Sequence, residues 1–145
     1  MQRLRNAGLL DVIRRLEQPV LGICLGMQLL CEASEEENVD CLGIIPGLVR
    51  KLEVSEGHTV PNMGWCATRV TAAHPVLDGI GDGSWFYFLH SYALPVSSAT
   101  IASARHSGEF SAMVCKDNFV AAQFHPERSS DAGARLLRNF VEWQT

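Results

Sequence analysis

The 145-residue sequence lacks several features that would assign it to a broad class of protein. It has no cluster of Lys and Arg, and a formal net charge of −4 gives it no basic surface for nucleic-acid phosphates. No apolar run approaches the ~20 residues that a membrane-spanning helix requires. Internal repeats and low-complexity segments are also missing. These absences argue against nucleic acid and membrane as partners, and leave small molecules and other proteins.

The cysteines lack the patterns of a disulfide framework or a zinc site. They are five in number, form no Cys-x-x-Cys pair and follow no secretory leader. A reducing, cytoplasmic location without a bound metal is therefore expected. With 47% hydrophobic and 19% charged residues, the chain is expected to form a single domain over residues 1–145.

The sequence does contain an alternation of helical and strand patterns. Helices are expected at 9–16 and 26–33 and from about Ser130, where Ala134, Leu137, Phe140 and Val141 share one face. Strands are expected at 20–23, 42–52, 66–70, 85–94, 100–106, 110–116 and 118–124. The pattern predicts an α/β fold with an open, mostly parallel sheet flanked by helices.

Cys24 lies between two glycines in Gly22-Ile23-Cys24-Leu25-Gly26, at the junction of a short apolar strand and a helix. This matches the G-x-nucleophile-x-G turn, in which small neighbours let the backbone present a nucleophile above the sheet. The N-terminus of the following helix would favour the thiolate. The alternative is a buried structural cysteine, since unpaired cysteine often packs as a small hydrophobe.

His125-Pro126-Glu127 follows another apolar strand and supplies a candidate base. In an extended segment, residues i and i+2 point to the same side, so the Glu127 carboxylate can approach the His125 ring. Pro126 is expected to keep these residues extended. Cys24, His125 and Glu127 then form a nucleophile, a base and an orienting carboxylate at the carboxyl ends of strands.

Two motifs in this order carry a family resemblance. Gly22-Ile23-Cys24-Leu25-Gly26-Met27-Gln28 and Gln123-Phe124-His125-Pro126-Glu127 resemble those of class I, triad-type glutamine amidotransferases, whose fold is flavodoxin-like. Within that superfamily, Pro61-Asn62-Met63-Gly64-Trp65, Phe88-Leu89-His90-Ser91-Tyr92 and Glu127-Arg128-Ser129 resemble the glutaminase subunits of imidazole glycerol phosphate synthases. The resemblance runs from about Leu4 to Trp143.

The resemblance implies a glutaminase in which Cys24 attacks the glutamine side-chain amide. It further implies that Gln28 and Glu36 hold the α-amino end of glutamine and that the backbone around Ser91 and Tyr92 holds its carboxylate. The N–H of Leu25 would stabilise the oxyanion. His90 is expected to be structural, and no cofactor is implied.

The resemblance also implies a heterodimer with a (β/α)8-barrel cyclase, which uses the ammonia to form imidazole glycerol phosphate and AICAR in histidine biosynthesis. Met63, Trp65 and Arg128 are then interface candidates, and Trp and Arg are enriched at interface hot spots. Two alternatives remain open from the residues. One is another α/β thiol hydrolase, such as a γ-glutamyl hydrolase, and the other is a non-catalytic remnant that at most binds the cyclase.

In the resembling proteins the nucleophile strand follows several dozen residues, which carry the first strands of the sheet and a Pro-Gly-x-Gly turn with an oxyanion-hole donor. Here only residues 1–18 precede that strand. We therefore expect a family domain whose N-terminal part is absent, with an uncovered sheet edge and marginal stability of the isolated chain.

Overall fold

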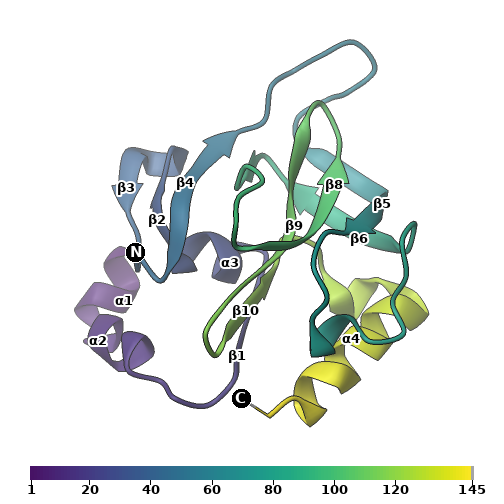
Figure 1. The fold of residues 1–145 in the computed structure, drawn as a ribbon. Coiled ribbons are helices and arrows are strands. Elements are labelled where there is room, and N and C mark those ends of the chain that lie inside the picture. The colour runs from purple at the N-terminus through teal and green to yellow at the C-terminus, as the bar shows by residue number, and fades with distance from the viewer. Residues whose placement is uncertain (145) are drawn as a thin grey trace.

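The computed structural model describes residues 1–144, which form two sheets flanked by helices (Figure 1). The α-helices are α1 Gln2–Asn6, α2 Leu9–Arg14, α3 Leu25–Leu30 and α4 Ser130–Glu142, and the 3-10 turns are η1 Glu36–Asn38, η2 Pro75–Leu77 and η3 Pro126–Arg128. The strands are β1 Val20–Ile23, β2 Cys31–Ser34, β3 Val39–Asp40, β4 Ile45–Lys51, β5 Asn62–Val70, β6 Trp85–His90, β7 Tyr92–Ala93, β8 Thr100–Arg105, β9 Glu109–Lys116 and β10 Phe119–Ala122.

The larger sheet has the order β1-β10-β9-β8-β5-β6, and the smaller has the order β3-β2-β4-β7. In Figure 1 the small sheet, α1 and α2 lie on one side of the molecule, and α4 lies on the opposite side. None of the helices within residues 1–144 has the length and apolar character that crossing a membrane requires.

The α/β class is confirmed, but the expectation of a mostly parallel sheet is wrong. Only β1 with β10 and β2 with β4 pair in parallel, and the other described pairs are antiparallel. The reason is the length of the connections. Strands β8, β9 and β10 follow one another through short turns at 106–108 and 117–118, and such turns can join only antiparallel neighbours.

Two hydrophobic clusters hold the layers together. One gathers under α4 and includes Phe86, Phe88, Phe124, Met113 and Leu136. The other lies between α3 and the two sheets and includes Met27, Ile45, Val49, Leu94 and Phe119. Along β10, Phe119 and Ala121 belong to the second cluster while Val120 and Ala122 belong to the first. This period-2 alternation shows that β10 lies between two covered faces.

Two helices differ from their expected form. The helix expected at 26–33 ends at Leu30, because Cys31–Ser34 pairs with β3 and β4 as strand β2. In α4 the buried residues are Gly133 and Leu136, whereas Ala134 is exposed and Val141 is 82% exposed. The apolar face is therefore rotated from the expected one, because Gly133 lies against the Pro126 carbonyl of η3.

Strand β1 lies at one edge of the larger sheet and pairs only with β10 among the described residues. This parallel pairing brings the two predicted motifs together. Ile23 is in register with Ala122, and the N–H of Cys24 donates to the Ala122 carbonyl at 2.7 Å. Cys24 follows β1, and His125 comes soon after β10. Both residues therefore lie beyond the carboxyl ends of these two parallel strands, at the same end of the larger sheet.

Candidate active site

Cys24 occupies a strained turn between β1 and α3. Its φ of 50° and ψ of −104° lie outside the regions that side-chain-bearing residues favour, at a typical cost of about 1–3 kcal/mol. Gly22 is required beside it, since a Cβ there would lie 2.9 Å from Leu30 Cδ1 and 3.0 Å from the Gly26 carbonyl carbon. Gly26 has no such requirement, because a Cβ there would meet nothing within 4 Å. The steric need expected at both glycines is thus found only at Gly22.

The structure joins His125 and Glu127, although by a different geometry from the one expected. Residues 126–128 form the 3-10 turn η3 and do not stay extended. Pro126 suits the first turn of a helix because its fixed φ and missing N–H cost nothing there. The turn places the Glu127 Oε1 atom 2.8 Å from His125 Nδ1. Nδ1–H therefore points at the carboxylate, and Nε2 is the nitrogen available as a base.

The backbone of His125 is fixed to strand β6. The N–H of His125 donates to the Tyr87 carbonyl at 2.8 Å, and the Ser129 hydroxyl donates to the His125 carbonyl at 2.6 Å. The same hydroxyl accepts from the Tyr87 N–H at 2.9 Å. These bonds hold the base in one position relative to β6, which also borders the site.

The thiol of Cys24 is held by other groups than the imidazole. It donates to the Leu89 carbonyl at 3.7 Å, and it accepts from the Gln123 side-chain amide, also at 3.7 Å. Among residues 1–144 no hydrogen bond joins the sulfur to the His125 ring. Catalytic hydrogen bonds are often long or unformed without substrate, so the absence of this bond describes a resting state and does not remove His125 as a candidate base.

Burial raises the pKa of the Cys24 thiol, and the Glu127 and Glu36 carboxylates raise this pKa further. The N–H of Leu25 and the amide of Gln123 act in the opposite direction and favour the thiolate. The expected lowering of this pKa by the helix is therefore wrong in net direction. Because the resting thiol is protonated near neutral pH, a base must remove its proton before it can attack.

A cavity of about 370 Å³ opens beside the thiol. Six of its lining residues are ones that the resemblance assigned to the nucleophile, the oxyanion or the substrate: Cys24, Leu25, Gln28, Glu36, Ser91 and Tyr92. Pro61, Leu89 and His90 complete the lining. His125 and Glu127 do not line this cavity, but the Glu127 carboxylate lies near enough to Cys24 for its charge to raise the pKa of the thiol. The site residues come from segments far apart in the sequence and meet at one end of the larger sheet.

Three buried polar residues that line this cavity or bond to its lining residues were not singled out as functional in the sequence: Asn62, His90 and Gln123. His90 Nδ1–H donates to the Tyr92 carbonyl at 2.9 Å, and its Nε2 accepts from the Asn62 amide at 3.0 Å. Burial lowers the pKa of His90 to about 4. A neutral His90 thus braces the Ser91–Tyr92 segment, in agreement with its expected structural role.

Gln28 is buried, and both hydrogens of its amide are used within the protein. Its Nε2 donates to the Tyr92 carbonyl at 3.0 Å and to Gln123 Oε1 at 3.1 Å. Only Oε1 of Gln28 remains free to accept a hydrogen bond from a ligand. Glu36 is exposed at the mouth of the same cavity, so the free groups at this end are acceptors that suit a cationic group.

The three interface candidates lie on the outer side of β5, β6 and η3. Met63 is 67% exposed and Trp65 is 48% exposed, and both belong to β5. Trp65 contacts the edge of the Tyr87 ring, and the Arg128 guanidinium lies 4.4 Å above the same ring. These side chains therefore form one continuous exposed surface.

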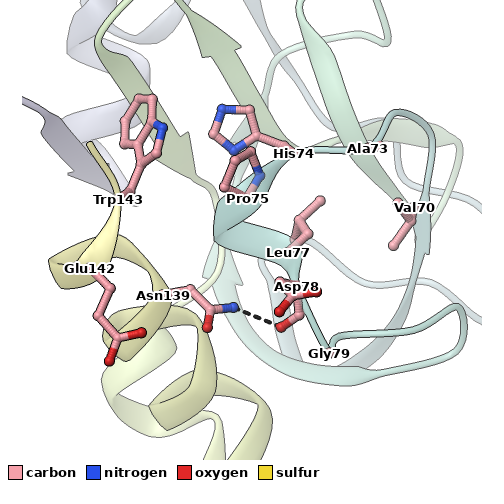
Figure 2. A pocket seen from close by; sticks show the side chains of 10 residues that line it. All are labelled: Val70, Ala73, His74, Pro75, Leu77, Asp78, Gly79, Asn139, Glu142 and Trp143. Atoms are coloured by element: carbon pink, nitrogen blue, oxygen red, sulfur yellow. Dashed lines mark hydrogen bonds between the residues drawn. The ribbon is translucent and has the colours of Figure 1, made fainter. Parts of the chain in front are cut away.

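A larger cavity lies elsewhere and contains none of the predicted site residues. It measures about 700 Å³, and its walls include His74, Asp78, Asn139 and Trp143 (Figure 2). The Asn139 amide donates to the Asp78 carbonyl at 2.8 Å and thereby joins α4 to the segment after η2. Size alone does not identify the reactive site, because the strained Cys24 lines the smaller cavity. Nor do three His, Cys, Asp or Glu side chains converge anywhere within residues 1–144 in a way that could hold a metal.

The site combines a thiol, an imidazole–carboxylate pair and a small cavity. These groups are typical of enzymes that form a covalent acyl intermediate. The family described as glutamine amidotransferase class-I matches residues 5–143. The HisH subunit of imidazole glycerol phosphate synthase from Xylella fastidiosa (strain Temecula1) is 49% identical over 142 residues, which are 98% of this chain and 71% of that protein. The chain belongs to the class I glutamine amidotransferases and, within them, to the HisH family.

Further relatives agree with this assignment. The HisH 2 protein of Legionella pneumophila (strain Lens) is 46% identical over 145 residues, which are all of this chain and 73% of that protein. A solved glutamine amidotransferase has a TM-score of 0.69 at 20% identity, covering 96% of this chain and 69% of the other. A glutamine amidotransferase from Thermotoga maritima has a TM-score of 0.60 at 18% identity, covering 95% of this chain and 51% of the other. At these identities, the two structures support the fold alone.

Proposed function

We propose that this chain is a single-domain glutaminase that hydrolyses glutamine to glutamate and ammonia. It supplies the ammonia to the cyclase subunit of imidazole glycerol phosphate synthase, which makes imidazole glycerol phosphate and AICAR in histidine biosynthesis. The observation that carries the proposal is the shared cavity. Cys24, Gln28, Glu36 and Tyr92 line one space of about 370 Å³. The His125–Glu127 pair follows the strand that pairs with the one before Cys24, and the Glu127 charge acts on the Cys24 thiol.

The first half of the reaction forms a thioester. His125 Nε2 takes the proton of the Cys24 thiol, and the sulfur attacks the side-chain carbonyl carbon of glutamine. The N–H of Leu25, which favours the Cys24 thiolate, donates to the oxyanion of the tetrahedral intermediate. The intermediate collapses as His125 returns the proton to the leaving nitrogen, so that ammonia departs and a γ-glutamyl thioester remains. Glu127 holds the imidazole in the required tautomer.

The second half hydrolyses the thioester. His125 takes a proton from water, the hydroxide attacks the thioester carbonyl, and the thiol leaves with that proton as glutamate is released. The raised pKa of the Cys24 thiol makes the base necessary in the first step. It also makes the neutral thiol a suitable resting form between turnovers.

Substrate recognition uses the acceptors at the other end of the cavity. Gln28 Oε1 accepts from the α-ammonium of glutamine, and the Glu36 carboxylate lies at the same end and pairs with that charge. The backbone at Ser91 and Tyr92 receives the α-carboxylate. Because His90 and Gln28 both bond to the Tyr92 carbonyl, this backbone segment is fixed before the ligand arrives.

The partner is a (β/α)8-barrel cyclase, bound as a heterodimer through the surface of Met63, Trp65 and Arg128. Strand β6 connects this surface with the nucleophile. Leu89 pairs with Met63 in register, and its side chain is 38% exposed, while its carbonyl holds the Cys24 thiol. Docking of a partner against β5 and β6 can therefore move the carbonyl that keeps the thiol away from its base. Glutamine hydrolysis is thereby coupled to the presence of the cyclase.

The proposal is tested by synthesis of imidazole glycerol phosphate with two nitrogen sources. Cys24→Ala, combined with the cyclase, should abolish synthesis from glutamine and leave synthesis from ammonium salts unchanged. Cys115→Ala, another half-buried cysteine on β9, is the matched control and should support both. Equal loss of both activities in Cys24→Ala would contradict the role of Cys24 in ammonia supply.

A further inference from the structure

Gln123 is a fully buried polar residue that lies between Cys24, the proposed nucleophile, and Gln28, the proposed substrate-binding residue. Its side chain is 0% exposed, although a buried amide is unfavourable unless its donors and acceptor find partners. Its Nε2 donates to the Cys24 sulfur at 3.7 Å, and its Oε1 accepts from Gln28 Nε2 at 3.1 Å. Gln123 is therefore the only described side chain that bonds to both Cys24 and Gln28.

The direction of these bonds is set by a backbone carbonyl. Tyr92 C=O can only accept, so the amide group that faces it, Gln28 Nε2, must be the donor end. The second N–H of Gln28 then requires an acceptor, which turns the Gln123 oxygen toward it. The remaining end of Gln123, its NH₂ group, faces Cys24. The Tyr92 carbonyl thus fixes the orientation of both amides and aims an N–H donor at the sulfur.

We infer that Gln123 is a positioning residue of the glutaminase site: it holds the Cys24 sulfur with an N–H donor and fixes the free oxygen of Gln28 toward the cavity. This inference rests on the proposed function for the part that concerns Gln28. The part that concerns Cys24 stands on the hydrogen-bond geometry of the resting protein alone.

Two physical consequences follow for the thiol. An N–H donor stabilises a thiolate more than a thiol, so Gln123 offsets part of the effect of burial and of the Glu127 and Glu36 carboxylates on Cys24. The same bond limits rotation of the side chain about χ1, because the sulfur would have to leave its donor. Loss of the amide should therefore make the thiolate scarcer and the sulfur less well placed.

The test is the pH dependence of Cys24 alkylation by iodoacetamide in the full chain, followed by peptide mass spectrometry so that the other four cysteines do not interfere. Gln123→Met keeps most of the volume and removes both polar groups. At pH 7.5 its Cys24 should react about tenfold more slowly than wild type, with the midpoint of the profile moved to higher pH. Asn139→Leu, which removes a partly buried amide that also makes two bonds far from the site, should leave the profile unchanged.

Gln123→Glu provides the second variant, because it keeps the shape and an oxygen acceptor for Gln28 while removing the NH₂ donor. Its Cys24 profile should also move to higher pH. If either variant folds, as judged by its circular dichroism and melting transition, and keeps the wild-type alkylation profile, the role of Gln123 toward Cys24 is overturned.

The role toward Gln28 is read separately from the KM for glutamine in the complex with the cyclase. Gln123→Met should raise this KM several-fold, whereas Gln123→Glu should leave it near the wild-type value while kcat falls. Equal KM values in the two variants would contradict the fixing of Gln28. Because alkylation requires neither glutamine nor the cyclase, a failed alkylation result is distinct from a failure of the glutaminase proposal.

Discussion

The Cys24 thiol donates a hydrogen bond to the backbone carbonyl of Leu89, 3.7 Å away, and in the described chain it makes none to the ring of His125. A protonated thiol held by a carbonyl is a resting nucleophile, and burial of the thiol raises its pKa in the same sense. In the proposed mechanism, turnover requires the sulfur to leave Leu89 and approach Nε2 of His125. Since Leu89 also contributes to the exposed surface of β5 and β6, release of the thiol can be linked to partner binding.

The first prediction concerns the carboxylate that orients the base. Glu127→Gln keeps the size of the side chain, but it presents an amide to His125 Nδ1 in place of the carboxylate 2.8 Å away. Glutamine-dependent turnover by the complex should fall about 10²–10⁴-fold, because the imidazole loses its required tautomer. Ammonia-dependent synthesis should not change. Glu142→Gln at the end of α4 is the control, and a wild-type rate in Glu127→Gln would remove Glu127 from the triad.

The second prediction separates the two glycines of the nucleophile turn. Gly22→Ala should destabilise the chain by about 1–3 kcal/mol, because the new Cβ would press on Leu30 and on the backbone at Gly26. Gly26→Ala should be neutral or stabilising by up to about 1 kcal/mol, since the space is open and alanine favours the helix. Urea unfolding of the two variants measures the difference. Equal effects would mean that the close packing of β1 against α3 does not explain Gly22.

The third prediction is a pH dependence of stability that arises from His90. Its pKa is lowered to about 4 in the folded state, whereas the unfolded chain has the ordinary value near 6.5. As pH falls below 6.5, the unfolded state binds the proton first, so the stability that neutral His90 provides is lost progressively toward pH 4. Between pH 7.5 and 4.5 wild type should lose about 2–3 kcal/mol more than His90→Asn. Parallel stability profiles of the two proteins would exclude this effect.

The fourth prediction concerns the proposed cyclase surface. Trp65→Ala should weaken binding of the cyclase by about 2 kcal/mol, or roughly 30-fold in Kd, because a half-exposed aromatic at such a surface is typical of a hot spot. Unfolding should change little, since Trp65 is 48% exposed. Val141→Ala, on an 82% exposed residue of α4, is the matched apolar control. If the two variants bind the cyclase equally well, the surface at β5 and β6 is not the interface.

The sequence predicts several strands and helices of this fold because local patterns of apolar residues and glycines determine them. Val20–Ile23 is a short apolar strand in both the prediction and the structure, and the glycines around Cys24 correctly indicate a strand-to-helix turn. The end of α3, in contrast, cannot be predicted from the local sequence. Cys31–Ser34 continues a helical pattern, and only its pairing with β3 and β4 makes it a strand. Tertiary contacts overrode the local preference at that point.

The candidate site was likewise predictable only in part from the sequence. The sequence identifies Cys24, His125 and Glu127 as candidates because each follows an apolar strand, so that all three are expected at the carboxyl ends of strands. The parallel pairing of β1 with β10 brings those two ends together. The direction of the Cys24 pKa shift was not predictable, since it depends on burial and on carboxylates from distant segments. Gln123 gave only a weak signal, because an amide inside an apolar strand indicates a buried partner without identifying it.

Covalent trapping of the nucleophile is the decisive experiment for the glutaminase role. The chain is mixed with the cyclase and an electrophilic glutamine analogue such as a diazoketone, and the adduct is located by peptide mass spectrometry. We predict a single adduct on Cys24 that forms faster when the cyclase and its nucleotide substrate are present, and none in His125→Ala. Absence of an adduct on Cys24, with complex formation shown independently, would contradict a glutaminase role for this chain.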